Sequence, residues 1–243
     1  MRHRVAYQEI RQLLHEHRCA FTVLDWKERH KPTDLLTFDG SLRLEPNCAF
    51  LGGDILCSMG AFSYTWSALP PHAQVGRFCS IARGLTILGT RHPYERVTTS
   101  SMTYDANFCI FKDSEYPIRP KPKTQNSLQI SDDVWIGQNV TLARDLRVGR
   151  GAVIAANSMV VKDVKPYEIV GGNPARHIKW RFPEATIALL EASKWWTYHP
   201  RQYAHLDMSD PVSFAQAVIA QSAQQNWLTY QPDCLTTKKL IRR

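Results

Sequence analysis

Large aliphatic residues recur at every sixth position through the middle of the chain. Between residues 130 and 165 the first position of each six-residue unit is filled by Ile130, Ile136, Leu142, Val148, Ile154 and Val160. The fifth position is apolar or small, and is filled by Val134, Val140, Leu146, Ala152, Ser158 and Val164. Small or polar residues between these positions allow a tight turn. The pattern therefore predicts a short strand and a corner in each unit, and a parallel β-helix with three strands per coil.

The same period extends toward the N-terminus. Val75, Ile81 and Ile87 head three clear units. A weaker series places Leu44, Phe50, Leu56 and Phe62 at first positions, with Cys48 and Gly60 at fifth positions. Asp54 and Trp66 do not fit this series, and the phase slips by one residue near residues 68–72. We expect the β-helix to occupy residues 41–180.

The period is lost between His92 and about residue 127. This stretch is rich in proline and in polar and aromatic residues. A segment of about 35 residues without a pattern of its own is uncommon inside a compact domain and usually serves a function. We expect an arm over about residues 93–127 that leaves the coil at one corner.

The two ends of the chain have helical patterns. Apolar residues with helical spacing between Ala6 and His17 predict a helix within an N-terminal extension, residues 1–40. Pro183-Glu184 and Asp210-Pro211 are typical helix starts, so two helices are expected within the C-terminal region, residues 181–243. Because an open β-helix end exposes core and unpaired strand edges, we expect these helices to cap the coil.

Composition excludes several classes of protein. A hydrophobic fraction of 44% over 243 residues excludes disorder as the main state. No apolar run is long enough for a transmembrane helix, and no apolar stretch follows the N-terminal charges as in a signal peptide. The six cysteines form no Cys-x-x-Cys motif, which argues against a zinc ribbon or a thioredoxin-like site. We therefore expect reduced thiols and a cytoplasmic protein.

The net charge of +8 suits an anionic partner. Nucleic acid is disfavoured because the basic residues are spread along the chain, whereas peripheral contact with acidic lipids stays open. A short basic run near the C-terminus is expected to be a solvated end; it comprises Lys238, Lys239, Arg242 and Arg243.

Several segments together resemble a known family. They read Gly76-Arg-Phe-Cys-Ser-Ile-Ala-Arg, Gly89-Thr-Arg-His-Pro, Asp133-Val-Trp-Ile-Gly, Ala156-Asn-Ser-Met-Val-Val-Lys-Asp-Val and Val170-Gly-Gly-Asn-Pro-Ala-Arg. These are similar to the hexapeptide-repeat acetyltransferases, and most to the branch of xenobiotic acetyltransferases and sugar O-acetyltransferases. The resemblance covers about residues 44–195. It implies a left-handed coil, acetyl-CoA as co-substrate, and a homotrimer with active sites between subunits.

His92 is the candidate general base. Acetyl transfer to a hydroxyl group needs a group that accepts the hydroxyl proton, and histidine titrates near neutrality. In the family pattern a histidine eleven residues after the isoleucine of Ser-Ile-Ala is catalytic, and Ile81 and His92 have this spacing. Cys79 occupies a fifth position, where a small inward residue is wanted, so we expect direct attack by the acceptor rather than a cysteine intermediate.

The resemblance also implies a coenzyme groove. Its expected residues are Ala82, Gln138, Ala156, Val161 and Lys162, with Arg176 and Lys179 at the phosphate end. Val161 departs from the family, which often has threonine there, and Arg176 and Lys179 have the alternative of plain surface charge. Tyr94 and Tyr104 of the arm are candidate acceptor contacts. Trp135 is either a stacking residue for a ligand or a packing residue.

The expected function is acetyl-CoA-dependent O-acetylation of a sugar or bacterial surface polysaccharide. Aromatic and basic residues along the arm favour an anionic sugar; they include Tyr94, Arg96, Tyr104, Phe108, Phe111, Lys112, Tyr116 and Arg119. The alternatives are a xenobiotic acetyltransferase of the chloramphenicol or streptogramin type, and a noncatalytic scaffold. A zinc carbonic anhydrase on the same coil is disfavoured because residues 130–165 contain no histidine, and no metal is expected.

Overall fold

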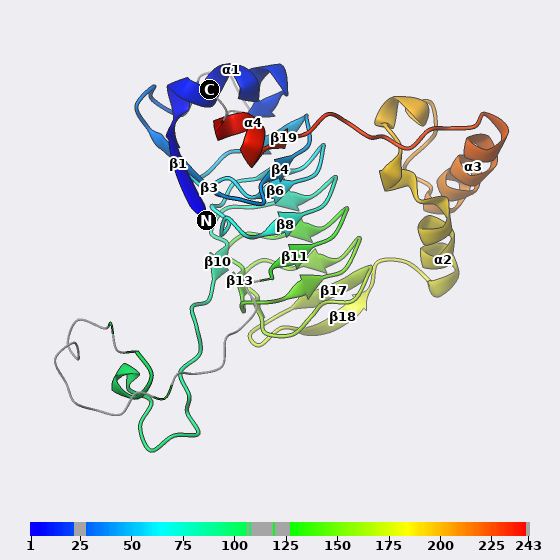
Figure 1. Ribbon diagram of the computed structural model, residues 1–243. Coiled ribbons are helices and arrows are strands. Elements are labelled where there is room, and N and C mark those ends of the chain that lie inside the picture. The colour runs from blue at the N-terminus through cyan, green and yellow to red at the C-terminus, as the bar shows by residue number, and fades with distance from the viewer. Residues whose placement is uncertain (22–27, 106, 108–118, 120–126, 242–243) are drawn as a thin grey trace.

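The chain forms a left-handed parallel β-helix with a long arm, as expected, and with helices at one end and beside the coil (Figure 1). The computed structural model describes residues 1–21, 28–105, 107, 119 and 127–241. Short strands from successive coils stack into three sheets, which we call the long, medial and short sheets. None of the helices in the described part of the chain has the length and apolar character needed to span a bilayer.

The long sheet runs the whole height of the coil. From the N-terminal end its strands are β2 (Cys19–Ala20), β5 (Cys48–Phe50), β7 (Tyr64–Thr65), β9 (Ser80–Ile81), β12 (Trp135–Ile136), β15 (Val153–Ile154), β17 (Glu168–Gly171) and β18 (Arg176–Trp180). All neighbours are parallel except β18, which folds back antiparallel on β17. This hairpin closes the C-terminal end of the sheet.

The other two sheets are shorter. The medial sheet contains β4 (Arg43–Leu44), β6 (Ser58–Met59), β8 (Gln74–Val75), β11 (Gln129–Ile130) and β14 (Arg147–Val148), with β19 (Leu235–Thr236) antiparallel on β4. The short sheet contains β10 (Thr86–Ile87), β13 (Thr141–Leu142) and β16 (Met159–Val160). The short sheet therefore begins at the coil from which the arm departs.

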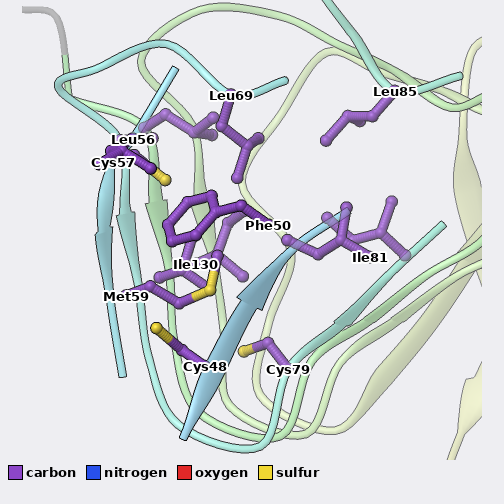
Figure 2. Packing of buried hydrophobic residues seen from close by; sticks show 14 of the residues in the cluster. Cys48, Phe50, Leu56, Cys57, Met59, Leu69, Cys79, Ile81, Leu85 and Ile130 are labelled. Carbon is purple, nitrogen blue, oxygen red and sulfur yellow. The ribbon is translucent and has the colours of Figure 1, made fainter. Parts of the chain in front are cut away.

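The predicted core positions between residues 130 and 165 are confirmed. Every first-position and fifth-position residue of those units is buried, with Val164 the most exposed at 5%. Figure 2 shows the same inward packing in the upper coils, where Phe50, Met59 and Ile81 meet inside the sheets. Aliphatic contacts stacked along the axis thus form one continuous core.

The weaker N-terminal series was partly wrong. Met59, not Phe62, is the inward residue, and it pairs with Leu44. Phe50 and Met59 are nine positions apart where two full units would take twelve. The chain shortens here because the short-sheet side of this coil is reduced to a single bridge between Thr37 and Ile55. Phe62 instead turns a corner.

The corners between residues 130 and 159 are each turned by a residue in the left-handed backbone region. The fourth position of the unit takes this conformation in Asp133 (φ +55°), Asn139 (φ +57°), Asp145 (φ +60°), Gly151 (φ +66°) and Asn157 (φ +60°). Glycine, asparagine and aspartate tolerate it best. On the corner between the medial and long sheets, however, aromatic residues adopt it: Phe62 (φ +64°), Phe78 (φ +62°) and Tyr167 (φ +57°).

The N-terminal helix covers the first coil, as predicted. Helix α1 (Tyr7–Glu16) buries Tyr7, Ile10 and Leu14 in the main core. Ahead of it, β1 (Arg2–Ala6) pairs antiparallel with β3 (Leu35–Asp39). This end of the β-helix is therefore closed by the N-terminal extension (Figure 1).

The C-terminal basic run is not simply a solvated end. Helix α4 (Thr237–Ile241) contains Lys238 and Lys239, and it returns to the first coil. Leu240 is buried in the main core, and the Thr237 hydroxyl donates to the Asp39 carbonyl at 2.7 Å. Arg242 and Arg243 lie outside the described residues.

The two predicted C-terminal helices form, but they do not cap the coil. They are α2 (Glu184–Ser193) and α3 (Pro211–Gln224), and the Asp210 carboxylate caps α3 by accepting from Val212 and Ser213. Together with the 3-10 turns η3 (Trp195–Thr197) and η4 (Pro200–Gln202) they lie beside the coil (Figure 1). Their aromatic residues form a separate cluster with Tyr167 of the coil corner; it includes Trp195, Trp196, Tyr203 and Phe214.

A buried ion pair fastens this C-terminal region to the corner. The Arg77 guanidinium donates to both carboxylate oxygens of Glu45, at 2.6 and 2.8 Å, and to the carbonyl of Tyr230 at 2.8 Å. Burial alone would raise the pKa of Glu45, but the contact with Arg77 outweighs it and the pKa lies below its usual value. Arg77 therefore joins the coil to the chain that follows η4.

The left-handed corners yield a paired prediction. Asn139 is exposed, so replacing its side chain disturbs little packing. Asn139→Val should lower the free energy of unfolding by about 1–2 kcal/mol, because a β-branched residue is strained at positive φ. Asn139→Gly should be nearly neutral. Chemical denaturation of the two variants checks this, and equal stabilities would contradict the role given to the corner.

Candidate active site

The arm leaves the coil directly after β10. The backbone N–H of Leu88 still donates to the carbonyl of Leu142 at 2.9 Å, and His92 follows four residues later. The described part of the arm includes the 3-10 turn η1 (Ser101–Thr103). Four arm residues singled out from the sequence lie outside the described residues: Phe108, Phe111, Lys112 and Tyr116.

The arm itself fixes the orientation of the His92 imidazole. Nδ1 lies 2.7 Å from the carbonyl oxygen of Thr99 and 3.0 Å from the hydroxyl of Tyr104. The Tyr104 ring meets the imidazole edge to face, with centroids 5.9 Å apart. Because a carbonyl oxygen can only accept, Nδ1 must carry the proton and donate it to Thr99. The lone pair of Nε2 is then left to accept a proton from another molecule.

The orienting carbonyl of Thr99 was not anticipated from the sequence. A backbone carbonyl is present at every residue, so no residue type marks the one that will face a histidine. Tyr104, in contrast, was expected to contact the acceptor, and here it packs against His92 on the side away from Nε2.

The arm also carries other aromatic and cationic groups. Tyr94 is exposed, and the Arg91 guanidinium lies 4.0 Å from the centroid of its ring. The Arg96 guanidinium donates to the carbonyl and hydroxyl oxygens of Thr103, at 3.0 and 3.1 Å. Arg96 therefore supports the arm's own fold, while Tyr94 presents a ring to solvent.

The residues expected to line a coenzyme groove lie at the two edges of the short sheet. Ala82, Gln138 and Ala156 follow β9, β12 and β15 at the corner that leads into this sheet. Backbone hydrogen bonds hold these corners one above another. For example, the N–H of Ala82 donates to the carbonyl of Ile136 at 3.0 Å. Val161 directly follows β16 at the opposite edge, and Lys162 comes next.

That second edge is also where the arm begins. Strands of the short sheet are parallel, so β10 and β16 end on the same side. The two strands lie two spacings apart, about 10 Å at 4.8 Å per strand. His92 and Lys162 thus leave the coil at the same edge, with β13 between them.

Two further cations lie below this edge on β18. The N–H of Ala175 donates to the carbonyl of Met159 at 2.8 Å, which places the start of β18 beside β16. Arg176 and Lys179 are both exposed on this strand. The structure therefore brings Lys162 and Arg176 near the same end of the short sheet, whereas Lys179 pairs with Ile169 of β17 within the long sheet.

Trp135 lies apart from these residues. It points outward from β12 of the long sheet and is 58% exposed, while its neighbour Ile136 is buried. It borders a hollow of about 290 Å³ that also contains Ser80, Asp133 and Arg181. Within one chain the structure does not bring Trp135 together with His92.

Two of the residues that line this hollow form an ion pair. The Arg181 guanidinium donates to the Asp133 carboxylate and to the Gly151 carbonyl, each at 2.8 Å. Burial raises the pKa of Asp133 above its usual value, and the contact with Arg181 only partly offsets this effect. The pair also holds the chain after β18 against the corner of the coil.

Cys79 is unsuited to nucleophilic catalysis. Its side chain is fully buried in the core, and its thiol lies 3.0 Å from the carbonyl of Ser131. Burial raises the pKa of this thiol to about 12, so the thiolate is scarce near neutral pH. Across the described residues, no three His, Cys, Asp or Glu side chains are grouped so as to hold a metal ion.

Comparison with curated proteins finds related acetyltransferases. The chain is 41% identical over 128 residues to a probable macrolide acetyltransferase of Lysinibacillus sphaericus, covering 51% of this chain and 68% of that protein. It is 36% identical over 127 residues to a chloramphenicol acetyltransferase of Klebsiella aerogenes, covering 51% of this chain and 59% of that protein. The chain thus spans about three fifths of the length of the chloramphenicol acetyltransferases it matches. No family model matches the chain.

Solved structures with related folds are more distant. The polySia-specific acetyltransferase NeuO is 23% identical with a TM-score of 0.38, covering 59% of this chain and 65% of that one. A hexapeptide-repeat containing acetyltransferase from Vibrio cholerae is 22% identical with a TM-score of 0.27, covering 55% of this chain and 59% of that one.

Proposed function

The chain belongs to the hexapeptide-repeat acetyltransferases, and on this basis we propose that it transfers an acetyl group from acetyl-CoA to a hydroxyl group of a small acceptor. The observation that carries the proposal is the hydrogen bond from His92 Nδ1 to the Thr99 carbonyl. It leaves Nε2 as a base on an exposed arm, which departs from the same edge of the short sheet as Val161 and Lys162.

His92 acts as general base and then as general acid. Acetyl-CoA supplies the acetyl group as a thioester. Nε2 takes the proton of the acceptor hydroxyl while its oxygen attacks the thioester carbonyl carbon. The imidazolium keeps its Nδ1–H bond to Thr99, which stabilises the charge during this step. The same Nε2 then returns the proton to the departing thiolate sulfur, so protons balance over the cycle.

The proposed coenzyme path follows the short sheet. Ala82 and Ala156 are small, so the backbone at that corner is open to a ligand chain. Lys162, Arg176 and Lys179 are exposed cations at the C-terminal end, and such groups pair well with phosphates. These features fit a thioester near His92 and phosphates toward β18.

For the acceptor, we favour the xenobiotic alternative over the sugar that the arm's charges first suggested. The matched curated relatives carry macrolide and chloramphenicol acetyltransferase names. Arg96 is also less suited to bind an anionic sugar, because its guanidinium is hydrogen-bonded to Thr103 within the arm. The exposed ring of Tyr94 suits a flat or ring-shaped acceptor of either class.

We also propose that the chain assembles into a trimer through the outer face of the long sheet. Exposed apolar side chains gather there, including Tyr64, Trp135 and Ile178. A contact on this face would bring a neighbouring subunit's surface to Trp135. Trp135 would then face that subunit, whereas within one chain it lies apart from His92. It also accommodates the packing alternative for this tryptophan.

Removal of the proposed base tests the mechanism. His92→Ala should lower kcat by about 10²–10⁴-fold while the affinity for acetyl-CoA stays unchanged. Thiol release should be measured with macrolides, chloramphenicol and sugars as acceptors. His205→Ala, at an exposed histidine bonded to Gln221 in the C-terminal region, serves as the control and should keep full rate. Unchanged turnover in His92→Ala would remove His92 from the mechanism.

The phosphate end of the groove makes a separate prediction. Arg176→Gln and Lys179→Gln should each weaken acetyl-CoA binding by about tenfold, or about 1.4 kcal/mol, and reduce its dependence on salt. Calorimetric titration provides the affinities. Arg2→Gln, at the opposite end of the coil, is the matched control. If the control and the test variants bind alike, these cations are surface charge only.

The trimer contact predicts a change in mass. Trp135→Glu should dissociate the assembly, because a charge would be buried in an apolar contact. Met208→Glu replaces a residue that is also 58% exposed but lies in the C-terminal region, and should leave the mass unchanged. Analytical ultracentrifugation distinguishes them. An assembly that survives Trp135→Glu would place the subunit contact on another face.

A further inference from the structure

Two thiols face each other where the N-terminal extension joins the coil. Cys19 of β2 and Cys48 of β5 occupy directly opposite positions on neighbouring parallel strands. Their Sγ atoms are 3.7 Å apart, and both residues are 2% exposed. Paired strands lie about 4.8 Å apart, which falls within the Cα separation that a disulfide spans. A bond between these sulfurs therefore needs only a small approach of two side chains.

The two thiols have different roles in their hydrogen bonds. The Cys48 thiol donates to the sulfur of Cys19, and the Cys19 thiol lies 3.8 Å from the carbonyl of His17. Cys19 is thus the sulfur that receives a hydrogen bond. The bond to Cys19, together with burial, raises the pKa of Cys48 well above its ordinary value.

A cavity gives small molecules access to the pair. It has a volume of about 670 Å³, and Cys19 and Cys48 both line it, together with Ala49, Ser63 and Tyr64. The other thiols buried in the described coil, those of Cys57 and Cys79, do not line this cavity. The position of the cavity therefore selects this pair among the buried thiols of the coil.

We propose that Cys19 and Cys48 form a redox-reactive pair, which a small peroxide converts into a disulfide that joins β2 covalently to β5. The Cys19 thiolate attacks one peroxide oxygen, the O–O bond breaks, and the products are a sulfenic acid on Cys19 and hydroxide, which takes up the proton that the thiol had lost and leaves as water. The Cys48 sulfur then attacks the sulfenic sulfur of Cys19, the S–O bond breaks, and the Cys48 thiol proton leaves with the hydroxide as water. In total, two thiols and hydrogen peroxide give one disulfide and two waters.

The disulfide would be a covalent link at a weakly held edge of the long sheet. Strand β2 is the outermost strand of the long sheet and is held by two residue pairs only, Cys19 with Cys48 and Ala20 with Ala49. A disulfide closes the loop formed by residues 20–47, which restricts the unfolded chain and stabilises the fold. Oxidation would thus lock the N-terminal extension onto the first coil.

Thiol counting on the native protein tests the proposal. The full chain is treated with hydrogen peroxide, quenched, denatured and alkylated, and its intact mass is measured. Two of the six thiols should become resistant to alkylation, a linked peptide should join Cys19 to Cys48, and dithiothreitol should restore six. The reaction should accelerate as pH rises, because the first step uses a thiolate. Six free thiols after peroxide, or a different linked pair, would overturn the proposal.

Single substitutions separate the two steps. Cys48→Ser should stop at a sulfenic acid on Cys19 that dimedone captures, whereas Cys19→Ser should give neither product. Cys57→Ser, another buried cysteine of the coil, should react as the unmodified protein does. If either variant fails to fold, the melting temperature of the unmodified protein decides. It should rise on oxidation and return with dithiothreitol. An unchanged melting temperature in a sample that carries the disulfide would refute its stabilising role.

Discussion

Backbone pairing between successive coils requires each coil to turn its corners in the same way. A strand of two residues can bond to its neighbours above and below only if the chain returns to the same position one coil later. The left-handed residues at fourth positions, such as Asn139 and Asn157, produce this return. Once the corners repeat, the first and fifth positions necessarily face inward, and the stacked core follows. The corner conformation therefore determines both the sheets and the hydrophobic packing.

The candidate site exists because this repetition is interrupted at one place. After β10 the chain leaves the short sheet, forms the arm, and re-enters at β11 in the register it would otherwise have kept. His92 lies where the chain is released from the ladder, so its orientation comes from the arm, through Thr99 and Tyr104. The coil supplies the regular edge along the short sheet. A rigid ladder and an irregular arm thus meet at the same edge.

The regular part of this architecture was predictable from the sequence, and the irregular part was not. The units between residues 130 and 165 each satisfy the same local rule, so a period in the sequence becomes a period in space. Phe62 was misplaced because shortened coils break that rule while still offering an apolar residue at the expected number. Thr99 could not be found because its backbone, not its side chain, contacts His92. The helices α2 and α3 were located correctly by their caps, but propensity says nothing about which surface a helix will pack against.

The aromatic corner shows how a local strain and a distant segment are connected. Phe62 and Phe78 hold the left-handed conformation that glycine or asparagine holds elsewhere, and they stack on each other with centroids 5.1 Å apart. Trp195 packs on Phe78, and Tyr230 packs on Phe62. The gain from burying these rings against the C-terminal region offsets the strain at the corner.

Strand β19 pairs with β4, so one of the last segments of the chain completes one of its first coils. During synthesis on the ribosome, the edge of the first coil therefore stays unpaired until residues 235 and 236 have emerged. The β-helix can build downward, coil by coil, as each unit appears, but it cannot finish its upper end in that order. A nascent chain that stalls before residue 235 would carry an exposed strand edge, a natural binding surface for chaperones or for another unfinished copy.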